Sequence, residues 1–158
     1  MTRISTFLES EGYILRSGGA RGADRFFENG IINPDNKRIY IIEQGFKGHQ
    51  SPLYGVCDKA LAIAKSVHPK WDSPKMLYNN CQGQRLHGRN VYQILGKTLD
   101  TPSKFVICWT PGGLLTGGTA TAIKLAKKYN VPCLNLGSVT TGRYMDAFEN
   151  FYLLAGAR

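Results

Sequence analysis

The stretch that decides the fold is Phe105-Val106-Ile107-Cys108-Trp109-Thr110-Pro111-Gly112-Gly113-Leu114-Leu115-Thr116-Gly117-Gly118-Thr119. It begins with an unbroken apolar run typical of a β-strand, and residues 120–130 behind it repeat with a helical period. The glycines between them let backbone N–H groups approach a ligand, and a helix N-terminus offers unpaired donors with a partial positive charge. We therefore expect a strand, a glycine loop and a helix whose natural guest is a phosphate or another anion.

A second glycine loop, Ser17-Gly18-Gly19-Ala20-Arg21-Gly22-Ala23-Asp24, repeats this arrangement. It follows a short predicted strand over 13–16 and leads into a helix in which Ala23, Phe26 and Phe27 have helical spacing. Either loop alone could be a glycine turn without a ligand. In an open parallel sheet, however, loops at the carboxyl ends of the strands share one edge, so two such loops predict one shared pocket.

The remaining sequence alternates between helical and strand patterns. The alternation predicts an α/β fold, a Rossmann-like three-layer sandwich with a mainly parallel sheet in which 105–109 is a central strand. The expected elements are a first helix with Ile4, Phe7 and Leu8 on its apolar face, a strand over 38–43, a helix capped by Ser51 with Pro52 in its first turn, an irregular stretch over 68–83 that could act as a lid, a short helix over 91–95, a strand over 131–136, and a final helix with Tyr144, Ala147, Phe148 and Phe151 facing inward.

Length and composition indicate a single domain over residues 1–158, because 158 residues with 42% hydrophobic content can bury a substantial core. The net charge of +9 favours polyanionic partners without choosing among them. No apolar run is long enough for a membrane span and no signal-like start is present, so we expect a cytoplasmic protein without membrane contact. The four cysteines form no C-x-x-C pair, and we expect neither a metal site nor a cofactor.

Three ordered segments carry a family resemblance: Leu15 to Asp24, Arg89 to Gly96 and Gly117 to Ile123. Their order and spacing resemble the SLOG superfamily, the Rossmann-like group that contains the DNA-processing protein A (DprA) family and the Lonely Guy (LOG) phosphoribohydrolases. The chain is most similar to small single-domain DprA-like proteins carried by bacteriophages. The resemblance covers nearly the whole chain, and three ordered motifs are more specific than any one of them.

Two departures from the family affect what the resemblance implies. The family usually begins with a strand and a Gly-Ser-Arg loop, whereas this sequence starts at the following helix, so the first family strand is missing or the sequence is a late-start version. An exposed strand left in this way could pair with another subunit, and we expect a homo-oligomer. The LOG enzymes also carry a glutamate after their Gly-Thr motif, but Thr119 is followed by Ala120-Thr121-Ala122. This departure argues against LOG-like hydrolysis.

Three functions follow from these patterns. The first is a binding module that holds the phosphates of a nucleotide-derived small molecule, with Arg21 or Arg89 clamping them and an acid reading the ribose. Because SLOG relatives include sensors of ADP-ribose-type signals in antiphage immunity, the resemblance implies that a phage protein in the host cytoplasm could sequester such a signal. The alternatives are a DprA-like mediator that binds single-stranded DNA and, last, a nucleotide N-glycoside hydrolase that takes a carboxylate from Asp24, Glu28 or Glu43.

The expected ligand-binding residues lie in and around the three motifs, with Glu43 added because it follows the first glycine loop at the offset of a ribose-binding acid. For Asp24 we favour a functional role, since it lies inside the family motif, and for Glu28 a solvated surface role. No catalytic residue is assigned. The expected set is Arg16, Ser17, Gly18, Gly19, Arg21, Asp24, Glu43, Arg89, Asn90, Thr110, Gly112, Gly113, Gly117, Gly118 and Thr119.

Overall fold

The strands of this protein are short and pair in two separate parallel sheets. In the computed structural model, which describes residues 1–155, β1 (Leu15–Ser17) pairs with β2 (Lys37–Ile39) and β3 (Val106–Cys108) pairs with β4 (Cys133–Asn135). The predicted mixed α/β class with parallel pairing is therefore confirmed. The prediction that 105–109 is a central strand was wrong, because among residues 1–155 β3 is hydrogen-bonded to β4 alone, in a two-stranded sheet.

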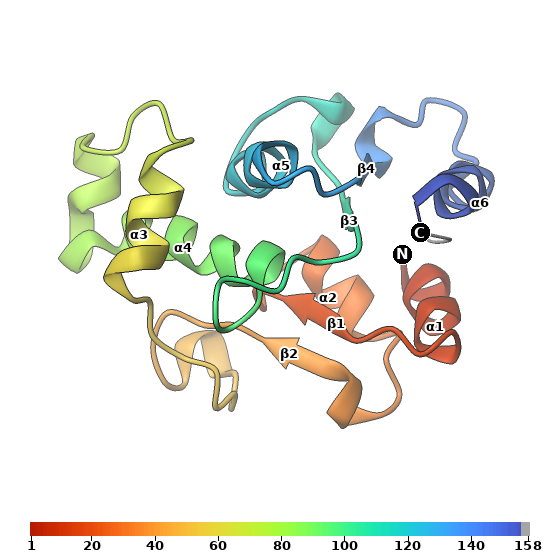
Figure 1. Cartoon of the computed structure of the whole chain (residues 1–158), viewed down its shortest axis with the longest axis horizontal. Helices are drawn as coiled ribbons and strands as arrows, with labels where there is room; N and C mark the ends of the chain where they lie inside the picture. The colour runs from red at the N-terminus through yellow and green to blue at the C-terminus, as the bar shows by residue number, and fades with distance from the viewer. Residues whose placement is uncertain (156–158) are drawn as a thin grey trace.

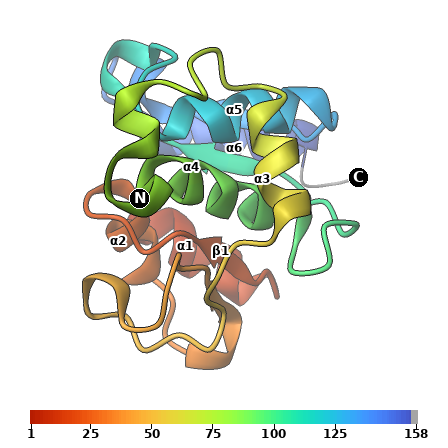
Figure 2. The ribbon, with the colours of Figure 1, turned by 90° about the vertical axis from the view of Figure 1, so that its left-hand side faces the viewer.

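Six helices among the described residues surround these strands (Figure 1). They are α1 (Thr2–Ser10), α2 (Ala23–Glu28), α3 (Asp58–Lys65), α4 (Pro74–Leu95), α5 (Thr119–Lys128) and α6 (Tyr144–Ala155), with short 3-10 turns η1 (Pro34–Asn36), η2 (Phe46–Gly48), η3 (Pro111–Gly113) and η4 (Leu136–Ser138) between them. Seen from the side, α4 runs through the middle of the molecule, with β1 and α2 on one side of it and α5 on the other (Figure 2).

Helix α4 is much longer than the helix predicted over 91–95. The expected irregular stretch is present only in part, since the helical backbone breaks at residues 78–81, where Asn79, Asn80 and Cys81 have positive φ. The helix then continues through Gly83 and Gly88 despite their low helix propensity. A Cβ on Gly88 would lie 2.6 Å from Val56 Cγ1, so this glycine allows α4 to pack closely on its neighbours. Tertiary packing thus overrides the local sequence signal.

The predicted start of the third helix was also wrong. Ser51 does not cap α3, which begins at Asp58, and the Ser51 hydroxyl instead donates to the carbonyl of Ile39. Next to it, Tyr54 forms a parallel bridge with Ile41. Ser51 and Pro52 therefore lie in a loop before α3, and the regular part of the predicted strand over 38–43 ends at Ile39.

Two apolar clusters form the core, one on each face of β3. Val106 packs against a cluster that α3, α4 and α5 contribute to, and Ile107 packs against a second cluster centred on Ile4, Phe27, Leu136 and Phe148. Consecutive strand residues point to opposite faces, so the strand lies between the two clusters. Three residues from predicted apolar helix faces are instead exposed, namely Phe7 in α1, Phe26 in α2 and Tyr144 at the start of α6.

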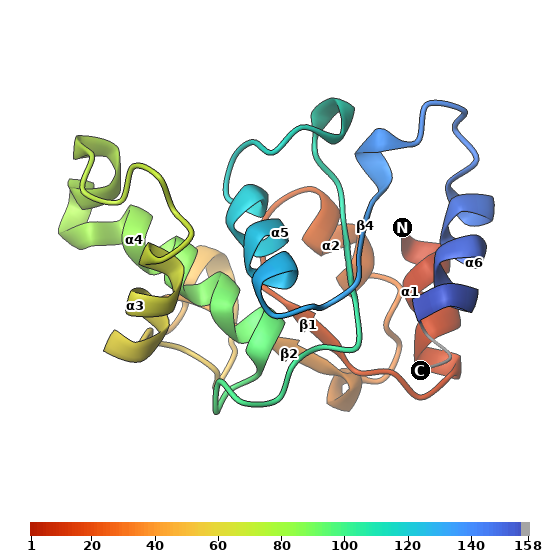
Figure 3. The same ribbon diagram turned by 45° about the horizontal axis from the view of Figure 1, so that its top comes forward.

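The first and last helices lie side by side (Figure 3). The centroid of the Phe7 ring lies 5.8 Å from that of Phe148 and 5.5 Å from that of Tyr152, and both contacts are edge-to-face. Such pairs add to the stability gained from burial of the rings. The second cluster is therefore built from both ends of the described chain. No helix among residues 1–155 combines the length and the apolar character needed to cross a membrane.

Removing a ring from this second cluster should destabilise the protein strongly. We expect Phe148→Ala to lower the free energy of unfolding by about 3–5 kcal/mol, because Phe148 is fully buried and its loss leaves a cavity. Leu153→Ala on the same helix is the matched control, since Leu153 is 73% exposed and should change stability by less than about 0.5 kcal/mol. Denaturant titration measures both, and equal effects would contradict this core.

Candidate functional site

Two consecutive residues of α4 link the two glycine loops. Arg89 Nη1 donates to the carbonyl oxygen of Gly18 at 2.6 Å, and Asn90 Nδ2 donates to the carbonyl oxygen of Gly118 at 2.9 Å. Both side chains are almost completely buried. The two loops, a hundred residues apart in sequence, therefore meet on one helix.

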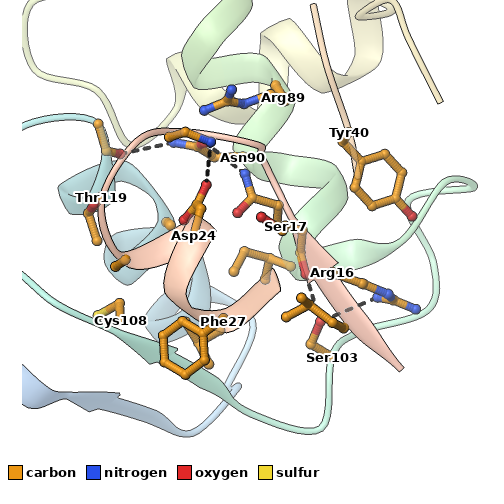
Figure 4. Close-up of a pocket in the computed structure, with 18 of the residues that line it drawn as sticks. Arg16, Ser17, Asp24, Phe27, Tyr40, Arg89, Asn90, Ser103, Cys108 and Thr119 are labelled. Carbon is orange, nitrogen blue, oxygen red and sulfur yellow. Dashed lines mark hydrogen bonds between the residues drawn. The ribbon is translucent and has the colours of Figure 1, made fainter. Parts of the chain in front are cut away.

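A cavity of about 1610 Å³ opens between the loops. Figure 4 shows Asp24 of α2, Asn90 of α4 and Thr119 of α5 arranged around it. Its wall combines apolar side chains with many charged and polar ones. The expected site residues that line it are Arg16, Ser17, Asp24, Arg89, Asn90, Gly117, Gly118 and Thr119.

The guanidinium of Arg89 is the most unusual group in the cavity. It is only 7% exposed, and its Nε atom is buried without a hydrogen-bond partner. Among residues 1–155, no carboxylate oxygen lies within 4.0 Å of a guanidinium nitrogen of Arg89, the limit for an ion pair. Burial lowers its pKa below the usual value, and the charges of Asp24 and Glu28 oppose this effect only from a distance. A buried cation without an anionic partner is costly, so its presence at a cavity wall indicates a ligand site.

The N-terminus of α5 lies at the same cavity. Gly118 is the N-cap residue and Thr119 the first residue of this helix, and no side chain forms a capping hydrogen bond. Gly118 has ordinary helical φ and ψ, and a Cβ at this position would meet no atom within 4 Å. Gly118 and Thr119 line the cavity, so the positive end of this ten-residue helix lies next to the buried guanidinium, although the Thr121 amide already donates to the Gly118 carbonyl.

The first glycine loop is held by its own side chains. The Gly19 amide donates to Ser17 Oγ at 3.2 Å and the Ala20 amide donates to Asp24 Oδ2 at 3.1 Å, while the Ser17 hydroxyl donates to Glu28. These contacts occupy the amides of Gly19 and Ala20, two donors that a phosphate in this loop would use. The loop thus forms a wall of the cavity, and Asp24 braces that wall.

Gly18 serves the site by its lack of a side chain. A Cβ on Gly18 would lie 2.8 Å from Arg89 Cζ and 2.7 Å from Gln93 Nε2, so any larger residue would displace the guanidinium. At Gly19, with φ of +65°, a Cβ would press against the ring of His49. The two glycines allow close packing behind the cavity and are not among its lining residues.

Several other expected residues lie away from the cavity. Glu43 forms an ion pair with Arg85 at 3.2 Å, and Arg21 is exposed on the first loop. Thr110 is buried and its amide donates to Asn135 Oδ1 at 3.1 Å, while Gly113 packs against Ser138. None of these lines the cavity, and neither does Gly112.

Gln93 and Trp109 are among the many other residues that line the cavity, and sequence reasoning did not select them as site residues. Gln93 donates to Asn90 Oδ1 at 3.1 Å and lies one helical turn after Arg89. A polar pair at this spacing within the apolar end of α4 is a signal that could have identified it. Trp109 is 40% exposed and lines the cavity where β3 ends. Its position directly before the glycine loop was visible in the sequence, but it was assigned to the strand.

His87, one turn before the site, is held neutral by its surroundings. Its Nδ1 lies 2.7 Å from Thr121 Oγ1, and its ring centroid lies 4.4 Å from that of His68. Burial is the largest cause that lowers the pKa of His87 to about 4, and the charges of His68, Arg89 and Lys75 contribute to the same shift. The histidine therefore carries no charge near neutral pH beside the buried cation.

Comparisons with protein-family models, curated proteins and solved structures find no match for this chain. The family resemblance therefore stays a hypothesis, and the site must be interpreted from its own geometry. Among the described residues, no group of three or more histidine, cysteine, aspartate or glutamate side chains is arranged to hold a metal ion.

The neutral state of His87 predicts a loss of stability in mild acid. Because its pKa is lowered on folding, the unfolded chain binds the proton more readily, and stability falls as pH decreases from about 6.5 towards the folded value of about 4. Between pH 7 and 5 we expect a loss of about 1 kcal/mol, after allowance for the solvent that reaches the ring. Urea titrations of wild type and His87→Gln across this range isolate the effect. An identical pH dependence of both proteins would show that His87 is not the group responsible.

Proposed function

We propose that this protein binds a nucleotide-derived small molecule through its phosphate, in the cavity between Arg89 and the N-terminus of α5. The observation that carries the proposal is the buried guanidinium with its unpaired Nε. Arginine side chains and helix N-termini are both strong phosphate-binding groups, and here they meet at one cavity. A phosphate there would supply the charge that the folded chain leaves without a partner.

The other cavity residues fit the remaining parts of such a molecule. Trp109 offers an aromatic face at the cavity wall on which a base could stack. Gln93 supplies an amide group beside the guanidinium that is suited to a hydroxyl group of a ribose, while Asn90 already bonds to Gly118 and Gln93 and holds that amide in place. The ligand class we favour is an ADP-ribose-type or cyclic nucleotide, bound without turnover, and the biological role we propose is sequestration of such a signal.

We further infer that the architecture is Rossmann-like, with the two apolar clusters and the strands between them forming three layers. The alternating contacts of Val106 and Ile107 support this inference. In such folds the ligand lies at the carboxyl ends of the strands, which is where both glycine loops follow β1 and β3. The SLOG resemblance implies the same arrangement.

Blocking the α5 N-terminus should abolish binding without unfolding the protein. Gly118→Val places its side chain in open space, so the helix can still form while the new methyl groups fill the position of the phosphate. We expect affinity to fall below about one hundredth of wild type in calorimetric titrations against a panel of nucleotides. Thr116→Val, on the same exposed loop but outside the cavity lining, is the matched control.

Circular dichroism verifies folding of both variants, and labelled oligo-dT is titrated in parallel. If the folded Gly118→Val protein still binds its nucleotide with wild-type strength, the site lies elsewhere. Binding of oligo-dT that survives physiological salt better than nucleotide binding would favour the DNA role, since contacts that depend only on net charge weaken steeply with salt.

Replacing Arg89 should separate binding from stability. Arg89→Met keeps much of the side-chain volume but removes the charge, so we expect nucleotide affinity to fall by about ten- to hundredfold, the worth of charge-assisted hydrogen bonds of about 1.5–3 kcal/mol. Without ligand, we expect the stability to change by less than about 1 kcal/mol, because loss of the hydrogen bond to the Gly18 carbonyl offsets the removal of a buried unpaired cation. Thermal unfolding and calorimetry measure the two effects. A strongly destabilised variant with unchanged affinity would show that Arg89 serves only to hold Gly18.

A further inference from the structure

The cavity extends beyond the anion site as a slot between β1 and β3. Every residue in 13–17 lines it, and so does every residue in 103–109. A strand that faced a cavity with one surface would contribute only alternate residues, because successive side chains point to opposite sides. Consecutive lining residues therefore mean that each strand presents its hydrogen-bonding edge to the slot.

The direction of the backbone groups supports this geometry. The Ser17 carbonyl accepts from the Tyr40 amide beyond β2, so Ser17 faces its paired strand and Arg16 directs its N–H and C=O the other way. On the other side, the Val106 amide donates to the Pro132 carbonyl next to β4, so Ile107 directs its backbone groups away from β4. Among residues 1–155, no strand pairing joins the two edges across the slot.

Both edges run in the same direction. At their amino ends, the ring centroids of Tyr13 and Phe105 lie 5.3 Å apart. At their carboxyl ends, Arg89 and Asn90 reach the two glycine loops from a single helix. The slot is thus flanked by two parallel strands with matched ends, and Figure 1 shows the two sheets apart.

The dimensions of the cavity suit one further strand. Five residues at about 3.3 Å each, with a strand spacing of about 4.8 Å and a sheet thickness of about 10 Å, occupy about 800 Å³. The cavity volume of about 1610 Å³ exceeds that of such a strand, and it also includes the anion site and the space lined by residues of the range 68–87. Apolar side chains lie on both faces of the slot. Leu15 and Ile107 pack against the cluster that contains Ile4 and Phe148, and Val106 packs against the cluster of α3, α4 and α5.

We propose that the slot between β1 and β3 accepts a parallel β-strand from another polypeptide, which joins the two sheets into one. A strand buried on both faces must be apolar throughout, so the partner segment is a run of about five residues rich in valine and isoleucine. The amino end of the slot is lined by the basic side chains of Arg16, Lys97 and Lys104, together with the acidic Glu11. The charges of Arg16 and Lys97 alone exceed that of Glu11, which favours an acidic residue just before the run.

This inference goes beyond the proposed nucleotide site but is connected to it. A parallel strand that enters the slot ends beside Gly18, Arg89 and Gly118, so the residue after it becomes part of the wall around the anion site. The partner would therefore bind to the sheet edges by backbone hydrogen bonds and complete the cavity at the same time.

Peptide binding to the whole protein tests the proposal. The probe is Glu-Val-Ile-Val-Ile-Val-Gly-Lys-Lys, and the matched control has the same sequence with N-methyl groups on alternate amides of the apolar run, which removes backbone donors but keeps the side chains. Fluorescence polarisation reports affinity, and hydrogen exchange followed by NMR reports the Arg16 and Ile107 amides. We expect the probe to bind and to slow exchange of these two amides by about tenfold or more, and the control to do neither.

Three results would overturn the proposal. Equal binding of probe and control would mean that an apolar surface without strand pairing takes the peptide, and absence of protection at Arg16 and Ile107 would place the peptide elsewhere. Slow exchange of both amides in the protein alone, together with a dimer in sedimentation, would assign the slot to a second copy of this chain. Nucleotide titrations are run separately, so failure of the anion site leaves the peptide result unaffected.

Discussion

The structure depends on one constraint, which is that Arg89 is buried on α4 between two glycine loops. The guanidinium is fixed by a 2.6 Å hydrogen bond to the Gly18 carbonyl, and the next residue fixes Gly118 in the same way. Helix α4 can approach the first loop this closely only because Gly18 has no side chain. The position of the loops, the shape of the cavity and the charge inside it all follow from this contact.

The sequence predicted the order of the elements well where the pattern was local and strong. Apolar runs correctly located β1, β3 and β4, and each glycine loop follows its strand as expected. The failures arise where long-range contacts decide. Gly88 argued against a long helix, but the close packing of α3 on α4 favours a glycine at this position. The Ser51 hydroxyl donates to the Ile39 carbonyl on a neighbouring segment instead of capping a helix. Neither contact can be derived from the local sequence.

The candidate site was predictable in position but only partly in detail. The motifs located Arg89, Asn90 and Gly118, which the structure brings together. They could not show that Asp24 uses its carboxylate to brace the first loop, since that depends on the distance to one backbone amide. Glu43 has the right spacing along the chain for a ribose-binding acid, but its direction in space leads it to Arg85. Spacing in sequence fixes the end of a strand, whereas burial and charge pairing decide which side chains remain available.

The packing of α1 against α6 has a consequence for how the chain folds. The second apolar cluster combines Ile4 with Phe148, so it cannot close until nearly the whole described chain has been synthesised. Contacts of such long sequence separation have a high entropic cost of closure and slow the search for the native topology. During synthesis, the apolar face of α1 stays without its final partner while the central elements emerge. This makes the nascent protein dependent on its last helix for protection against aggregation.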